Sequence, residues 1–190
     1  MLDLQHECAW IGGDSLGSNG FTKQTQAQSK VFRNDVFNNV VMGSTGSFRH
    51  IDLLRYSSLL FNGVDFYTGA NLDHKYMVTK FIPNLIKLFD ENIKHMKPED
   101  KGTNFIVCAK NKVFEVQTDY SVLEPLEGYT AVGSGEYAAL ASMYSTKDLD
   151  ISIPDKIRIA LESAEHCVCS VQRPFYIMST NPEEKTRIIS

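Results

Sequence analysis

The chain has 190 residues, of which 43% are hydrophobic and 22% charged, and its formal net charge is −4 at pH 7. This size and apolar content suit one domain with a sizeable core. Its basic residues are scattered without a Lys/Arg run, which argues against a nucleic-acid surface. No stretch has the roughly 18 apolar residues that a membrane span needs. We therefore predict neither a nucleic acid nor a membrane as a partner.

The first residues and the cysteines indicate a reducing compartment. Charged residues are frequent among residues 1–7, where a signal peptide would carry an apolar run. We expect the four cysteines to be buried free thiols and the protein to be cytoplasmic. They are Cys8, Cys108, Cys167 and Cys169. The last two could form a soft-metal site, but no second pair matches them, so we predict no metal site.

The first 42 residues predict β-structure. Residues 2–13 predict two strands joined by a turn, with a short apolar run that stops at a pair of glycines. Residues 15–28 are polar and predict a loop or a weak edge strand. Residues 31–42 predict the next hairpin, with its turn at Asn34-Asp35.

Helical periodicity begins after Gly46. Apolar residues recur three to four positions apart, which predicts a helix that Ser47 can cap and that Asn62-Gly63 ends. A second helical pattern covers residues 73–96. Pro83 lies inside it and predicts a kink or a late start.

The second half repeats the order of strands followed by helices. Residues 104–109 and 113–117 predict a hairpin, and residues 129–132 a further short strand. One helix is expected from Gly135 and another from Pro154 to about Cys167. Residues 175–178 predict a last strand, and residues 181–190 a polar C-terminal tail with little order. This alternation supports the class α+β with layered elements in a single domain.

Four short motifs stand out, and each has a structural explanation when taken alone. Asp14 can be a turn or cap residue, Lys30 a surface lysine, and the glycines at 43 and 46 can shape the entry to a helix. Ser134 can belong to a strand-to-helix turn. The motifs are Gly12-Gly13-Asp14-Ser15, Ser29-Lys30-Val31-Phe32, the run from Val40 to Ser47, and Ala131-Val132-Gly133-Ser134-Gly135.

In this order and spacing, the motifs resemble the landmarks of the proteasome β-subunit and HslV family of N-terminal-nucleophile (Ntn) hydrolases. The resemblance extends over nearly the whole chain. It implies a four-layer αββα sandwich in a single Ntn-hydrolase-like domain of residues 1–180, followed by the tail of residues 181–190. It also implies a threonine protease that hydrolyses amide bonds and needs no metal or organic cofactor.

Such an enzyme uses the hydroxyl of a threonine at the first residue. Its own α-amine, which titrates near pH ~8, accepts the hydroxyl proton. The resemblance implies that Lys30 supports this amine, that Asp14 orients Lys30, and that Ser134 forms a hydrogen bond near the amine. It assigns Gly43 as the glycine whose N–H stabilises the oxyanion. These four are the predicted catalytic residues.

The chain departs from this pattern at two points. It begins Met1-Leu2-Asp3, and counting back from Asp14 places the nucleophile two or three residues before Met1. The family often carries an acid where the last long helix ends, and Glu165 or His166 corresponds to it only loosely. His166 is equally explained as a residue favoured by the helix dipole.

Two functions follow from this reading. The first is a proteasome- or HslV-like peptidase whose threonine lies upstream of Met1. The alternative is a non-catalytic proteasome-like subunit that acts as an assembly scaffold or binding module, and hydrolysis of a small-molecule amide is a third reading. The resemblance implies a peptide or protein substrate and a homo-oligomer built as a ring or stacked rings, and it leaves open an ATPase unfoldase as a partner.

Overall fold

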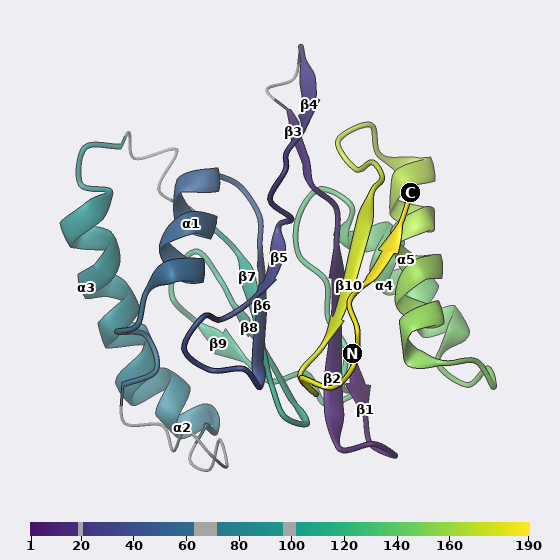
Figure 1. Ribbon diagram of the computed structural model, residues 1–190, viewed down its shortest axis with the longest axis horizontal. Helices are drawn as coiled ribbons and strands as arrows, with labels where there is room; N and C mark the ends of the chain where they lie inside the picture. The colour runs from purple at the N-terminus through teal and green to yellow at the C-terminus, as the bar shows by residue number, and fades with distance from the viewer. Residues whose placement is uncertain (19–20, 63–71, 97–101) are drawn as a thin grey trace.

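The computed structural model describes residues 1–18, 21–62, 72–96 and 102–190. Figure 1 shows two sheets packed face to face, with helices covering both outer faces. This is the predicted α+β sandwich with αββα layers. The first sheet has the order β1-β2-β10-β11, with strands β1 (Leu2–Asp3), β2 (Cys8–Gly13), β10 (Phe175–Ser179) and β11 (Arg187–Ile189).

The second sheet follows the chain more directly. Its order is β5-β6-β7-β8-β9, and every neighbouring pair is antiparallel. A separate hairpin of β3 (Leu16–Ser18) and β4 (Lys23–Thr25) projects beyond the sandwich, as Figure 1 shows. The strands of the second sheet are β5 (Val31–Arg33), β6 (Val40–Ser44), β7 (Phe105–Ala109), β8 (Lys112–Val116) and β9 (Val122–Leu123).

Helix α1 (Phe48–Tyr56) begins where its periodicity predicts. The Ser47 hydroxyl accepts a hydrogen bond from the Arg49 N–H and caps the helix. The helix ends at Tyr56, earlier than the predicted stop at Asn62-Gly63, and Gly63 lies outside the described residues. Together with α3 (Ile82–Asn92), α1 covers the second sheet.

The predicted helix of residues 73–96 is a composite. It comprises α2 (His74–Tyr76), a π-helical turn η1 (Met77–Phe81) and α3, and the Ile82 N–H donates to the carbonyl of Met77, five residues back. Pro83 follows at the start of α3. Because proline lacks an N–H and its ring crowds the preceding turn, a widened turn lets the helix pass it. The irregularity predicted at Pro83 is therefore a π-helical turn.

Helices α4 (Glu136–Thr146) and α5 (Ile153–Cys167) cover the first sheet. Pro154 lies in the first turn of α5, as predicted. The Lys156 ammonium is buried and donates to the Lys147 carbonyl at the end of α4 at 2.7 Å, which ties the two helices together. No helix among the described residues is long and apolar enough to cross a membrane.

Three sequence predictions are wrong in detail. Residues 181–190 are not a loose tail throughout, because Arg187–Ile189 forms β11 against β10. Residues 129–132 form no strand, because their main-chain groups have no ladder partner. Of the free cysteines, Cys8 and Cys108 are buried as expected, but Cys167 and Cys169 are exposed where α5 ends.

Candidate active site

Asp14 and Lys30 form an ion pair at the end of β2. The Lys30 Nζ donates to Asp14 Oδ1 at 2.8 Å, and the Leu16 N–H donates to Asp14 Oδ2 at 3.2 Å. The Asp14 side chain is 9% exposed and that of Lys30 21% exposed. The carboxylate is thus held on both oxygens, while the ammonium keeps access to the space beside it.

The main chain around Lys30 is fixed from three sides. Its N–H donates to the Asp14 carbonyl, and its carbonyl accepts from the Ser44 N–H, both at 3.2 Å. Arg55, at the end of α1, donates from Nη2 to the Ser29 carbonyl at 2.5 Å and stacks over the Phe32 ring. The sequence gives no local sign of this Arg55 contact, because it joins residues 26 positions apart.

Gly43 lies inside β6, between Val31 of β5 and Ile106 of β7. A Cβ there would come within 2.9 Å of Ile11 and Val31, so the glycine lets the two sheets approach. The Thr45 N–H donates to the Asn104 carbonyl, on the side of β7. Main-chain N–H groups two residues apart on a strand face the same neighbour, so the Gly43 N–H also faces β7. Within the described chain, the N–H groups of Gly46 and Ser47 donate no hydrogen bond.

Ser134 lies in the turn that precedes α4. Its Oγ accepts a hydrogen bond from Ser170 Oγ at 2.8 Å. Gly133 has a φ of +104°, and a Cβ at that position would lie 2.8 Å from the Thr45 side chain. A Cβ at Gly135 would lie 2.8 Å from Ala164 of α5. The two glycines therefore let this turn pass between β6 and α5.

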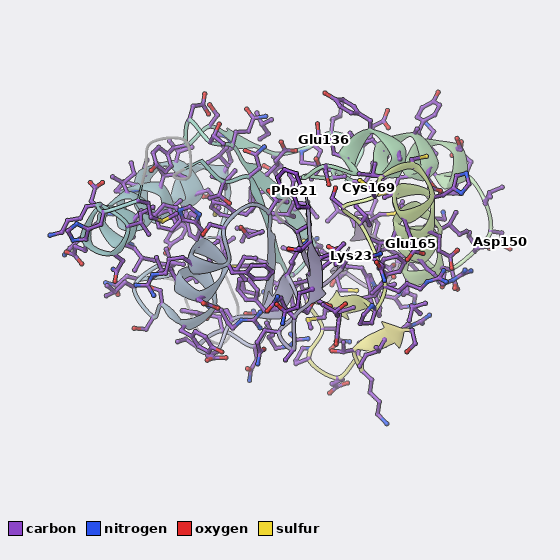
Figure 2. All side chains as sticks on the ribbon, turned by 90° about the horizontal axis from the view of Figure 1, so that it is seen from above. Phe21, Lys23, Glu136, Asp150, Glu165 and Cys169 are labelled. Atoms are coloured by element: carbon purple, nitrogen blue, oxygen red, sulfur yellow. The ribbon has the colours of Figure 1, made fainter. Side chains whose placement is uncertain are left out.

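The four predicted residues lie around one cavity of about 540 Å³. Glu165 and His166 do not line it. The Glu165 carboxylate instead accepts a hydrogen bond from the Arg173 N–H at 2.9 Å. Figure 2 shows Glu165 on α5. Among the residues described, no three His, Cys, Asp or Glu side chains are grouped to hold a metal ion. The cavity lining includes Gly12, Gly13, Asp14, Lys30, Gly43, Ser44, Thr45, Gly46, Ser47, Thr130, Ala131, Val132, Gly133 and Ser134.

The cavity extends between β2 and residues 130–132, in a part that we call the slot and that the sequence reasoning did not find. The Thr180 N–H donates to the Ala9 carbonyl of β2. Because the main-chain groups of successive residues in a strand face opposite sides, the N–H and C=O groups of Ile11 and Gly13 face β10, whereas those of Gly12 face the slot. On the opposite side, Thr130 and Val132 make no main-chain hydrogen bond in the described chain. Two unpaired backbone edges thus line one cavity.

Met1 closes one end of this slot. Its amino group donates to the Trp10 carbonyl at 2.7 Å, and the Trp10 N–H donates to the Met1 carbonyl at 2.8 Å. On the other edge of β1, the Leu2 N–H donates to the Gly128 carbonyl at 2.7 Å. Burial lowers the pKa of the Met1 amino group. Strand β1 therefore lies between β2 on one side and the segment that begins at Gly128 on the other. Beyond Met1, toward Asp14, these two edges are not paired with each other.

Comparison with solved structures identifies the same sandwich elsewhere. BPH from Thiobacillus denitrificans in complex with epoxomicin has a TM-score of 0.71 at 19% identity, covering 91% of this chain and 92% of that one. The eukaryotic HslV from Trypanosoma brucei has a TM-score of 0.62 at 20% identity, covering 91% and 93%. Anbu (ancestral beta-subunit) from Yersinia bercovieri has a TM-score of 0.67 at 13% identity, covering 95% and 82%.

No protein-family model matches the chain, and no curated protein does. The chain therefore has the fold of HslV and the proteasome-like Ntn hydrolases, as the motifs predicted. At these identities the likeness extends to the fold and not to the chemistry.

Proposed function

We propose that this protein is a proteasome- or HslV-like threonine peptidase whose nucleophile is the third residue before Met1. The observation that carries the proposal is the Asp14–Lys30 ion pair at the end of the slot. Both side chains line the cavity, and 21% of the Lys30 side chain is exposed there. They suit a reaction in which a nearby amine must be held partly neutral.

The register of β1 supports the position of this nucleophile. Met1 is paired with Trp10, so the first, second and third preceding residues would lie opposite Ile11, Gly12 and Gly13. The third residue is then adjacent to Asp14. Residues directly opposite one another in an antiparallel pair point their side chains to the same face of the sheet. A Cβ at Gly13 would contact Val31, so the side chain of the third preceding residue, opposite Gly13, would lie between the two sheets.

Three of the four predicted residues then have a role. The terminal amine takes the hydroxyl proton, while the Lys30 charge, oriented by Asp14, favours the neutral amine. Ser134, with its Ser170 partner, forms a hydrogen bond with that amine. The oxyanion is stabilised by the unused N–H groups of Gly46 and Ser47 beyond the end of β6, because the N–H of Gly43, the donor that the resemblance implies, faces β7.

The test is to place Thr-Ala-Val ahead of Met1 behind a removable leader, so that threonine becomes the first residue. This extended chain should hydrolyse a fluorogenic peptide. Because general-base assistance contributes roughly 10²–10⁴-fold, Lys30→Ala should lower kcat by about 100-fold or more. Lys87→Ala, on the exposed face of α3, is the matched control and should leave kcat unchanged. Hydrolysis that persists at full rate in Lys30→Ala would refute the proposed mechanism.

The alternative is a non-catalytic proteasome-like subunit that acts as an assembly scaffold or binding module, because the likeness to Anbu (ancestral beta-subunit) extends to the fold and not to the chemistry. It predicts that Asp14→Asn and Lys30→Ala change stability or assembly in the extended chain, with no turnover to lose. The ring-shaped homo-oligomer, the peptide or protein substrate, the ATPase partner and the cytoplasmic location stay predictions from the resemblance.

A further inference from the structure

Two thiols lie exposed where α5 ends, and the proposed peptidase mechanism does not use them. Cys167 is the last residue of α5, and Cys169 follows one residue after it. Figure 2 shows Cys169 just beyond this helix. Free cysteine is among the most buried residue types in proteins, as Cys8 and Cys108 are here. Packing therefore does not explain the exposed pair, which indicates a role for the thiols themselves.

The backbone between the two thiols brings them within reach of each other. Val168 caps α5 in an extended conformation, with φ −135° and ψ 120°. Two residues that flank an extended residue have Cα atoms about 6.4–6.8 Å apart. A disulfide accepts Cα separations of about 4.4–6.8 Å and prefers about 5.5–6 Å. Closing a bond between the two cysteines must therefore draw Cys169 about 0.5–1 Å toward the end of α5.

Cys169 belongs to a turn that reaches the candidate active site. The Val171 N–H donates to the Val168 carbonyl at 3.2 Å, so Cys169 and Ser170 are the central residues of a β-turn. Ser170 Oγ donates to Ser134 Oγ at 2.8 Å, and both serines line the cavity. Because Ser170 follows Cys169 directly in this closed turn, a shift of Cys169 also displaces Ser170 from Ser134.

We propose that Cys167 and Cys169 form a reversible disulfide that releases Ser134 from Ser170. The oxidant is a small-molecule disulfide, for which oxidised glutathione is the probe. One cysteine thiolate attacks the probe, which forms a mixed disulfide and releases one glutathione thiol. The other cysteine thiolate attacks the protein sulfur of the mixed disulfide and releases the second glutathione thiol. In total the protein loses two electrons and two protons, and the small-molecule disulfide gains them.

The effect on catalysis rests on the proposed function, whereas the disulfide itself does not. Ser134 is the proposed partner of the terminal amine, and Ser170 orients its hydroxyl. Oxidation should therefore lower the kcat of the peptidase about tenfold, as expected for one lost hydrogen bond. Because the bond has to draw the backbone together, a dithiol reductant should open it readily and restore kcat. The cysteine pair would thus reduce hydrolysis under oxidising conditions.

The first experiment uses the chain from Met1 to Ser190 and needs no turnover. Oxidised glutathione should lower the intact mass by two hydrogen atoms, and peptide mapping should locate the bond between Cys167 and Cys169. In the ¹⁵N-labelled chain, the Ser134 amide should shift on oxidation and return with dithiothreitol. Cys169→Ser is the matched control. Its Cys167 should retain one bound glutathione, and its Ser134 amide should shift much less.

The proposal is overturned if the wild-type chain gains glutathione in place of the internal bond, or if the bond forms while the Ser134 amide keeps its position. The second experiment measures kcat of the chain extended by Thr-Ala-Val ahead of Met1. Oxidation should lower kcat in this chain and leave it unchanged when Cys167→Ser and Cys169→Ser are combined, and equal losses in both would refute the role of the pair. A peptidase test that fails while the disulfide forms and shifts Ser134 would remove the proposed function and leave the disulfide intact.

Discussion

His50 is a buried polar side chain of α1 whose two ring nitrogens have no hydrogen-bond partner among the described residues. Its ring packs on Phe89 of α3, with 4.9 Å between the ring centroids. Burial lowers the pKa of His50, because the charged form would lose its hydration without gaining a partner. The folded protein therefore holds this imidazole neutral.

The pH dependence of stability should follow from this histidine. Below the ordinary histidine pKa of about 6.5, the unfolded chain binds a proton that the folded chain excludes. The free energy of unfolding should therefore fall as the pH falls below about 6.5, by at most about 1.4 kcal/mol per pH unit from this group. In His50→Leu this part of the slope should vanish, and the stability at pH 7.5 should be unchanged or higher by about 1 kcal/mol.

Urea denaturation of the wild-type chain and of His50→Leu at pH 7.5 and pH 5.5 measures both effects. His95→Gln is the control, because His95 is exposed after α3. The explanation fails if His50→Leu retains the same loss of stability between the two pH values as the wild-type chain.

At the scale of elements, β2 packs against α5 through a position that has no side chain. A Cβ at Gly12 would lie 2.4 Å from Ile157 Cγ2 and 3.0 Å from Leu161 Cδ1. Gly12→Ala should therefore destabilise the protein by about 1–3 kcal/mol through overpacking. Ile157→Leu removes Cγ2 at nearly constant volume, so adding it should recover about 1 kcal/mol of that loss.

A double-mutant cycle measured by urea denaturation isolates this coupling. Combining Gly12→Ala with Ile153→Leu gives the control pair, because Ile153 lies in the first turn of α5, and its atoms are farther from the added Cβ than the nearest atoms of Ile157 and Leu161. Additive effects in both pairs would show that the helix adjusts to the extra methyl group and that the close approach is not required.

The elements also show what the sequence could and could not predict. Ser47 as a cap, Pro154 in a first turn and the β-rich runs that form the hairpin of β7 and β8 are local patterns, and the structure has them. The Asp14–Lys30 contact was predictable only from the spacing of motifs in a known family. The Arg55–Ser29 contact and the π-helical turn depend on tertiary packing and were not predicted. Residues 129–132 have a strand pattern, but a ladder needs neighbouring strands, and the pattern does not supply them.

At the scale of the whole molecule, both ends of the chain belong to the first sheet, as Figure 1 shows. The C-terminal end is paired with β10 through β11. At the N-terminal end, where β1 stops at Met1, the main-chain groups of Gly12 on one side and of Thr130 and Val132 on the other have no hydrogen-bond partner among the described residues. Three residues added before Met1 would connect these edges. This link should stabilise the whole sandwich, because the slot lies between the two sheets and α5.

The chain extended by Thr-Ala-Val should therefore unfold at a higher temperature than the chain from Met1. Two or three net hydrogen bonds of about 1 kcal/mol each, at about 2–4 °C per kcal/mol for a domain of this size, predict a rise in Tm of about 4–12 °C. Exchange of the Gly12 amide hydrogen should slow in parallel. Thr-Pro-Val is the matched extension, since its proline, opposite Gly12, has no N–H to donate. It should give a clearly smaller rise, and equal rises for the two extensions would show that the added residues do not pair with β2.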